Sequence, residues 1–161
     1  MTDALKNPLT PIAAFYQRVE QIPDNICFVQ PLGDGVEEYS WARVNDEVRR
    51  MASYLHSLAL PPGSHISLFS KNCVHWIMAD LAIWMAGHVS VALYPTLAAE
   101  TVRYCLEHSD VKMLFVGKLD GWDGMKVGVP DGLPCVSYPL SPPTDFPTWD
   151  TLIKEHQPLA E

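Results

Sequence analysis

Two stretches of the chain carry apolar residues at helical spacing, in steps of three and four. The first starts after Thr10 and Pro11, which suit the N-cap and the first helical position, and ends before Pro23. The second starts after Ser40, another N-cap residue, and ends before a Pro-Pro-Gly turn at 61–63. The apolar face of this second helix comprises Val44, Val48, Met51, Leu55 and Leu58. The charged residues off that face are predicted to be solvated: Asp46, Glu47, Arg49 and Arg50.

Between these helices the pattern is typical of a β-hairpin. Residues 26–29 form a short apolar run, 33–35 are Gly-Asp-Gly, and 37–41 are expected to return as the second strand. The Gly-Asp-Gly segment lacks the third glycine and the following helix of a dinucleotide-binding loop. It is therefore interpreted as a turn.

From residue 65 onward, short apolar runs alternate with helical segments. The runs at 65–70, 89–93 and 111–116 are predicted strands, and the segments 73–86 and 98–108 between them are predicted helices. Short connections of this kind produce right-handed parallel βαβ units. The predicted fold class is α/β, with a parallel βαβαβ core preceded by an N-terminal helix and a β-hairpin.

The helix at 73–86 is apolar nearly all round, so we expect it to be covered on more than one side. Asn72 is its expected cap, and Gly87 occupies the position of a C′ glycine. His75 is interpreted as a buried histidine near the start of this helix. The predicted core residues of the segment are Trp76, Trp84 and Met85. After residue 117 the chain is expected to be rich in loops, with one more strand at 135–138 and a short helix at 148–156.

Composition places this chain among globular proteins of one domain. It has 161 residues, of which 48% are hydrophobic and 19% charged, with a formal net charge of −8. This acidic balance argues against nucleic acid as a partner, because neutralising phosphates requires clustered Lys and Arg. The apolar run at 76–94 is interrupted by Asp80, Gly87 and His88, so no transmembrane segment is predicted.

The cysteines and histidines do not form a metal-binding pattern. Four cysteines are widely spaced, the six histidines are scattered, and no signal-peptide pattern opens the chain. We therefore expect reduced thiols, no metal site and a cytoplasmic location. No G-x-S-x-G or phosphate-loop motif occurs, and no catalytic residue is assigned.

One loop is a candidate binding site. Tyr94, Pro95 and Thr96 directly follow the predicted strand at 89–93. Open parallel sheets bind ligands outside the carboxyl ends of their strands. Tyr94 and Thr96 are therefore candidate substrate-contacting residues, and a purely structural turn is the alternative.

An ordered set of segments carries a family resemblance. The segments are YSWA at 39–42, PGSHISL at 62–68, SKNCVHW at 70–76, DLAIWMAGH at 80–88, VALYPT at 91–96 and LFVG at 114–117. In this order and spacing, the chain resembles the N-terminal part of AMP-binding, adenylate-forming enzymes, and especially long-chain fatty acid–CoA ligases. The resemblance covers roughly the whole chain from residue 10.

The resemblance implies a two-step reaction. ATP and a fatty acid give an acyl-adenylate and pyrophosphate, and coenzyme A then displaces AMP to give a thioester. The implied cofactors and partners are ATP, Mg²⁺, coenzyme A and a fatty acid. Tyr94 and Thr96 map to a loop near the acyl or pantetheine channel, where many relatives have Asn-Pro-Arg. The phosphate loop and catalytic lysine of the family have no match in this sequence.

We therefore expect residues 1–161 to be a single truncated N-terminal subdomain, with a tail at 1–9 and a loop-rich end at 117–161. By itself it is expected to bind no cofactor, to be inactive, and to cover its exposed apolar surface by forming a homo-oligomer. The first alternative is a stand-alone, non-catalytic binding or regulatory module of the same fold. The second is an unrelated Rossmann-like nucleotide binder, which the missing G-x-G-x-x-G disfavours.

Overall fold

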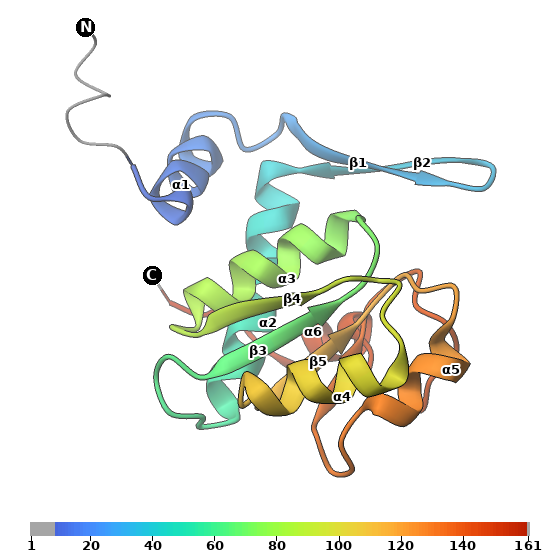
Figure 1. The fold of residues 1–161 in the computed structure, drawn as a ribbon. Helices are drawn as coiled ribbons and strands as arrows, with labels where there is room; N and C mark the ends of the chain where they lie inside the picture. The colour runs from blue at the N-terminus through green and yellow to red at the C-terminus, as the bar shows by residue number, and fades with distance from the viewer. Residues whose placement is uncertain (1–8, 161) are drawn as a thin grey trace, which may run out of the picture. The chain divides into compact units, whose positions relative to one another are not determined.

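A computed structural model describes residues 9–160 of the chain (Figure 1). The chain divides into two compact units, with the boundary between Asp46 and Glu47. This boundary falls inside helix α2, which spans Trp41–Ser57.

The first unit contains the predicted helix and hairpin. Helix α1 spans Pro11–Gln21, and the Thr10 hydroxyl caps it by accepting the N–H of Ala13 at 3.2 Å. Strands β1 (Ile26–Leu32) and β2 (Gly35–Ser40) pair antiparallel across the Gly-Asp-Gly turn. Both strands are longer than predicted around that turn. Trp41 was predicted to end the second strand, but it is the first residue of α2.

The second unit is built on a sheet of four parallel strands. These are β3 (His65–Phe69), β4 (Val89–Leu93), β5 (Met113–Val116) and β6 (Cys135–Ser137). Their spatial order is β4-β3-β5-β6, with β3 pairing in parallel with both β4 and β5. The predicted parallel βαβαβ core is confirmed, and the predicted strand near 135–138 extends it by one member.

Helices α3 (Val74–Met85) and α4 (Ala99–His108) cover opposite faces of this sheet (Figure 1). On one face, the Ser90 hydroxyl of β4 donates a hydrogen bond to the carboxylate of Asp80 in α3. On the other face, Leu93 belongs to a buried cluster with Val102 and Leu106 of α4. Ser90 and Leu93 point to opposite sides because side chains alternate along a strand. The sheet is therefore the middle layer of a three-layer unit.

Two predictions about α3 are wrong. Its N-cap is Cys73, not Asn72, and the cap makes no side-chain hydrogen bond. Of the three predicted core residues, Trp84 is 39% exposed and Trp76 and Met85 are only half-buried, so part of the apolar surface of α3 is uncovered. The end of the helix is as predicted, because Gly87 adopts φ +78 and donates its N–H to Trp84 O.

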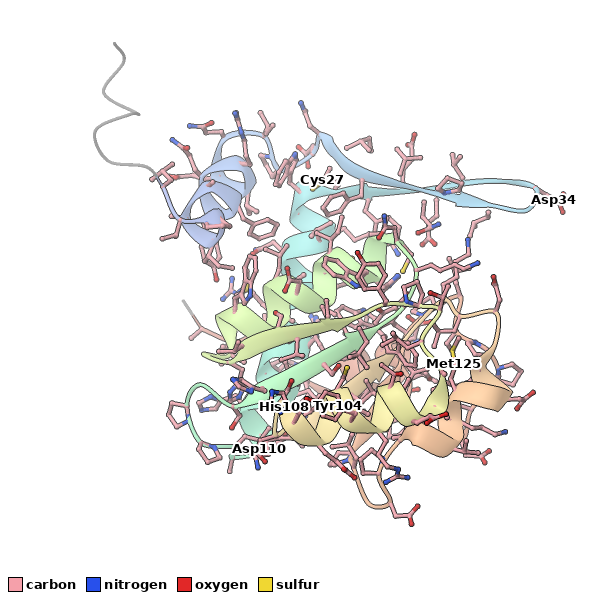
Figure 2. All side chains as sticks on the ribbon, in the orientation of Figure 1. Cys27, Asp34, Tyr104, His108, Asp110 and Met125 are labelled. Carbon is pink, nitrogen blue, oxygen red and sulfur yellow. The ribbon has the colours of Figure 1, made fainter. Side chains whose placement is uncertain are left out.

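After β5 the chain forms short helices, α5 (Trp122–Met125), a 3₁₀ turn (Lys126–Gly128) and α6 (Trp149–Glu155). Thr148, predicted as the first residue of the last helix, is instead the N-cap of α6, and its hydroxyl accepts the N–H of Thr151. On the outer face of α4, Tyr104 and His108 stack with ring centroids 5.3 Å apart (Figure 2). Within residues 9–160, every helix falls short of the length and apolar character that crossing a bilayer demands.

The charged residues of α2 from Glu47 onward are not simply solvated, which corrects the prediction. Arg49 donates from Nε to Leu159 O at 2.7 Å, and Arg50 donates to His156 O at 2.9 Å. These bonds hold the segment after α6 against α2. All four cysteines are free thiols; Cys73 and Cys135 are buried, whereas Cys27 and Cys105 are only half-buried.

Candidate functional site at the carboxyl edge of the sheet

The strand order defines where a ligand is expected in this fold. The chain runs from β3 to β4 on one side and then returns to β5 on the other side of β3. The topological switch point therefore lies between the carboxyl ends of β3 and β5, where open α/β sheets bind their ligands. Ser70 and Lys71 follow β3 there, and Gly117 and Lys118 follow β5.

Hydrogen bonds join the two loops at this switch point. The Ser70 hydroxyl accepts the N–H of Lys118 at 2.8 Å and donates to Lys71 O at 2.6 Å. The N–H of Lys71 donates to Lys118 O at 2.8 Å. On the outside, the Lys71 ammonium pairs with the carboxylate of Asp120. Both loops are thus held in one arrangement, with an ion pair at the rim.

Gly117 lets the two loops meet above an aromatic ring. A Cβ at this position would lie 2.0 Å from a ring carbon of Tyr138 and 2.5 Å from the Ser70 hydroxyl oxygen. Only glycine therefore fits without displacing a neighbour. Tyr138 is buried, and its pKa is raised by that burial, with a smaller contribution from Cys73 nearby. Its phenol stays protonated at neutral pH.

A pocket of about 210 Å³ lies beside the switch point, at the carboxyl ends of β3 and β4. Its lining is mostly apolar and aromatic, with the Ser70 hydroxyl and the Asn72 amide as polar groups. The lining residues are Ser70, Asn72, Trp76, Ala92, Leu93, Tyr94 and Pro95. Tyr94 is 77% exposed, which puts it at the mouth of the pocket. Thr96 is exposed and is not part of this lining.

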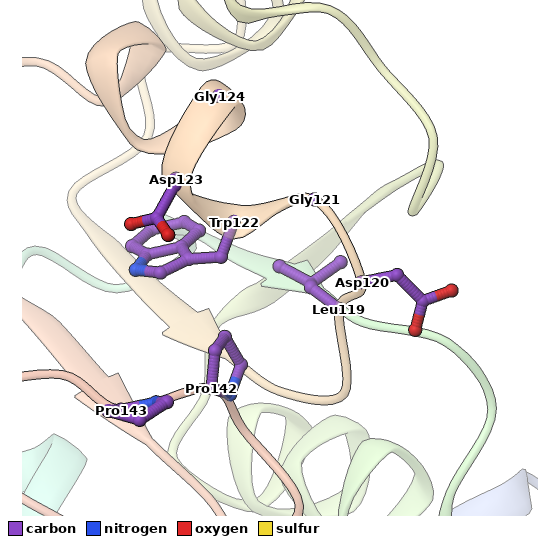
Figure 3. A pocket seen from close by; sticks show the side chains of 8 residues that line it. All are labelled: Leu119, Asp120, Gly121, Trp122, Asp123, Gly124, Pro142 and Pro143. Atoms are coloured by element: carbon purple, nitrogen blue, oxygen red, sulfur yellow. The ribbon is translucent and has the colours of Figure 1, made fainter.

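A second pocket of about 280 Å³ lies on the other side of the switch point (Figure 3). It is lined by residues 119–124 together with Pro142 and Pro143. The carboxylates of Asp120 and Asp123 stand on this loop, and Lys126 holds the pKa of Asp123 below its usual value through a hydrogen bond. The lining of this pocket contains no Lys or Arg, and Lys71 and Lys126 are paired with its two carboxylates, which makes it a poor site for a phosphate group.

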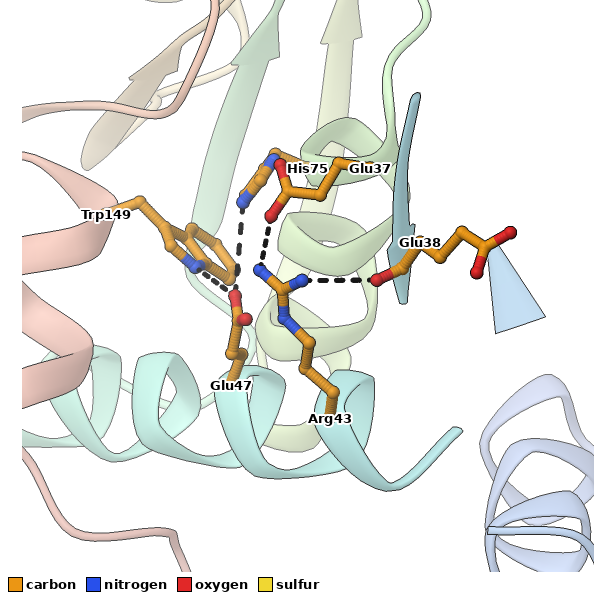
Figure 4. A network of polar contacts seen from close by, with 6 residues as sticks. All are labelled: Glu37, Glu38, Arg43, Glu47, His75 and Trp149. Carbon is orange, nitrogen blue, oxygen red and sulfur yellow. Dashed lines mark hydrogen bonds and ion pairs between the residues drawn. The ribbon is translucent and has the colours of Figure 1, made fainter. Parts of the chain in front are cut away.

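The second unit contains a buried network of polar side chains from α2, α3 and α6 (Figure 4). Glu47 of α2 accepts the indole N–H of Trp149 at 3.1 Å, and Nε2 of His75 lies 4.0 Å from the same carboxylate oxygen. The imidazole also stacks on Tyr138, with centroids 6.1 Å apart. The network joins α2, α3 and α6 to the Tyr138 ring that supports the switch point. As predicted, His75 is a buried histidine.

Of the two predicted site residues, the structure thus brings only Tyr94 to a pocket. The sequence prediction missed the residues of the switch point and the buried network, which are Ser70, Lys71, Gly117, Tyr138, Glu47 and Trp149. Gly117 carries the same signal that selected Tyr94, since it directly follows a predicted parallel strand, and Ser70 is the last residue of another. Among residues 9–160, no group of three or more His, Cys, Asp or Glu side chains is placed to hold a metal ion.

Comparison with known proteins identifies a family that matches this chain. The family model described as AMP-binding enzyme matches residues 15–157. The chain is 32% identical over 107 residues to long chain acyl-CoA synthetase 1 of Arabidopsis thaliana, covering 63% of this chain and 16% of that protein. It is 33% identical over 104 residues to the long-chain-fatty-acid–CoA ligase FadD15 of Mycobacterium tuberculosis, covering 64% of this chain and 17% of that protein. The chain thus spans about a sixth of the length of these relatives.

Solved structures share the fold. The anthranilate CoA ligase AuaEII, in complex with anthranoyl-AMP, superposes with a TM-score of 0.78 at 16% identity, covering 100% of this chain and 31% of that one. A benzoate CoA ligase from Burkholderia xenovorans LB400 superposes with a TM-score of 0.74 at 21% identity, covering 93% of this chain and 29% of that one. The predicted α/β fold is therefore confirmed as one that occurs in CoA ligases.

Proposed function

Because the chain belongs to the AMP-binding enzyme family, we propose that it forms the N-terminal part of a fatty acid–CoA ligase. Such an enzyme joins a fatty acid to ATP as an acyl-adenylate, with release of pyrophosphate, and then transfers the acyl group to the thiol of coenzyme A. The names of the long-chain relatives support the choice of a fatty acid as substrate. Residues 1–161 correspond in this proposal to one truncated subdomain of the whole enzyme.

The pocket beside β4 is the observation that carries the proposal. Its apolar and aromatic lining suits an alkyl chain or the pantetheine arm of coenzyme A, and the few polar groups lie together at Ser70 and Asn72. Tyr94 stands at its mouth, and Thr96 follows two residues later on the exposed loop. We propose that Tyr94 contacts the bound chain and that Thr96 borders its path.

The residues of this chain do not fit a nucleotide triphosphate. A triphosphate requires backbone N–H groups in a Gly-rich loop and unpaired cations. The loops at the switch point contain a single glycine, Gly117; Lys71 is paired with Asp120, and Lys118 is one exposed cation without a Gly-rich loop beside it. We therefore propose that other parts of the whole enzyme bind ATP and Mg²⁺.

The isolated chain should consequently be inactive. We expect no pyrophosphate release when residues 1–161 are incubated with ATP, Mg²⁺ and a long-chain fatty acid. Without a preorganised phosphate site the whole electrostatic stabilisation is missing, and a single such group is worth about 3 kcal/mol. Pyrophosphate release that depends on the fatty acid and persists after repurification would contradict this part of the proposal.

The activity itself is tested on the protein encoded by the complete reading frame that contains these codons. We expect fatty acid–dependent acyl-CoA formation, and we expect Tyr94→Ala to raise KM for the fatty acid or coenzyme A while KM for ATP stays unchanged. Tyr104→Ala is the matched control, because Tyr104 is also an exposed tyrosine, at 63%, but lies on the outer face of α4. Equal effects of the two substitutions would refute the role of the pocket.

The second candidate is a non-catalytic binding or regulatory module of the same fold. The pocket beside β4 is compatible with it as well, because holding an apolar ligand there requires no catalytic residue. It predicts that the complete gene product binds a fatty acid or acyl-CoA but forms no acyl-adenylate, so the same assay separates the two candidates. The expected cytoplasmic location stays a prediction.

A further inference from the structure

The two edge strands of the parallel sheet, β6 and β4, differ in what pairs with their outer side. At the β6 edge, the N–H of Ser137 donates to Pro147 O at 3.0 Å, and Ser137 forms a bridge with Thr148. At the other edge, no strand among residues 9–160 pairs with the outer side of β4. The sequence of β4, Val-Ser-Val-Ala-Leu, has no charge and no proline, and its register with β3 shows no bulge. It thus lacks the usual features that protect an edge strand from pairing.

The register shows which backbone groups of β4 face outward. Val89 donates its N–H to Ser64 O at 3.0 Å, toward β3, and the pairing continues without a break to Leu93. Backbone groups of successive residues point to alternate sides of a strand. Val89, Val91 and Leu93 therefore bond to β3, whereas the N–H and C=O groups of Ser90 and Ala92 point away from the sheet.

Apolar side chains lie along the same edge. Val89 is 46% exposed, and on α3 Ile77 and Trp84 are 41% and 39% exposed. Ile77 and Trp84 are two helical turns apart, so they share one side of α3, together with Asp80, which bonds Ser90 of β4. The open edge therefore belongs to an uncharged strand, β4, and the exposed apolar side chains of α3 lie on one face of the sheet beside it.

We propose that the β4 edge pairs with the β4 edge of a second copy of this chain, extending the sheet across a two-fold axis. Outward-facing N–H and C=O groups in alternation are complementary only to another extended strand. An antiparallel pair centred on Val91 places Ser90 opposite Ala92 of the partner subunit, and both residues have their backbone groups directed outward, as an exchanging pair of hydrogen bonds requires.

The side chains support pairing between copies. In that register Val89 lies opposite Leu93 of the partner subunit, and the strand brings no charge to the contact although the chain carries a net charge of −8. A self-complementary edge of this kind closes as an isologous dimer. Ala92 and Leu93 also line the pocket beside β4, but the test of pairing measures association and involves no enzymatic step, so it can fail without affecting the proposed function.

The test measures association of the 161-residue chain by sedimentation across a range of concentrations. We expect a monomer–dimer equilibrium, with slower hydrogen exchange at the amides of Ser90 and Ala92 as the dimer forms. Val89→Lys should raise the concentration of half-association by about tenfold or more, because it places a charge beside the paired edge. Val127→Lys is the matched control, because Val127 is 66% exposed and lies outside this edge.

Ala92→Pro gives a second, independent test. It removes an outward N–H without removing a bond to β3, and proline is tolerated at such edge positions. Circular dichroism establishes that each variant is folded. A monomer at every concentration, a dimer that both Val89→Lys and Ala92→Pro leave unchanged, or exchange at Ser90 and Ala92 that does not vary with concentration would each overturn the proposal.

Discussion

Substituting Gly117 by alanine tests the close packing at the switch point. The new methyl carbon would lie 2.0 Å from Cε2 of Tyr138 and 2.5 Å from the hydroxyl oxygen of Ser70. Neither neighbour can move freely. The Tyr138 ring is 2% exposed and packs against His75 and Phe115, with centroids 6.1 and 6.2 Å away, and the Ser70 hydroxyl is held by two backbone groups.

Forced insertion of a methyl group into a well-packed core costs about 1–3 kcal/mol, and the rigid surroundings here place the expected cost at the upper end, about 2–3 kcal/mol. For a chain of this size, that loss lowers Tm by about 4–12 °C, as measured by circular dichroism. Gly124→Ala is the control. A Cβ at Gly124 meets nothing within 4 Å, so Tm should stay nearly constant.

A double-mutant cycle identifies the cause of the effect. Tyr138→Leu removes the ring carbons that the new methyl group would meet, so adding Gly117→Ala to that variant should cost much less than in the parent chain. Equal Tm values for Gly117→Ala and Gly124→Ala would refute the packing argument. A penalty that persists unchanged in the Tyr138→Leu background would assign it to another contact.

Two further predictions concern buried polar groups. Burial, and to a smaller extent the charge of His56 nearby, lower the pKa of His88 from 6.5. Below about pH 6.5 the unfolded chain therefore binds more protons than the folded one, so the stability of the fold should decrease as the pH falls. His88→Gln should weaken this pH dependence in thermal melts. Trp149→Phe removes the indole N–H that Glu47 accepts at 3.1 Å, and should lower the free energy of unfolding in urea by about 1.5–3 kcal/mol; a loss below about 0.5 kcal/mol would show that the bond contributes little.

Local sequence signals were sufficient for the elements of the fold. Thr10 and Ser40 each accept an N–H at the start of the helix that they were predicted to cap, and Gly87 ends α3. These outcomes depend on residues within one helical turn of each other, so the sequence contains the relevant information directly. Asn72 shows the limit of such signals, since either of two adjacent residues can be the N-cap, and in the structure the N-cap is Cys73.

Burial of individual side chains was harder to predict. Glu47 lies off the apolar face of α2 and was predicted to be solvated, yet it is 8% exposed because Trp149, 102 positions later, donates to it. Trp84 shows the opposite error, since an apolar helix needs neighbours on every side to bury every side chain. Helical periodicity describes one element and says nothing of which distant residue faces it.

The sequence by itself determined the parallel α/β class, the positions of the strands and the family resemblance, because alternation of short apolar runs with capped helices is a local pattern. Only the tertiary structure decided the order β4-β3-β5-β6, and with it the switch point at Ser70 and Gly117 and the open edge of β4. Strand order is set by which distant segments exchange backbone hydrogen bonds, and the same apolar runs are compatible with several orders. A site assembled from the ends of non-adjacent strands therefore exists only once that order is fixed.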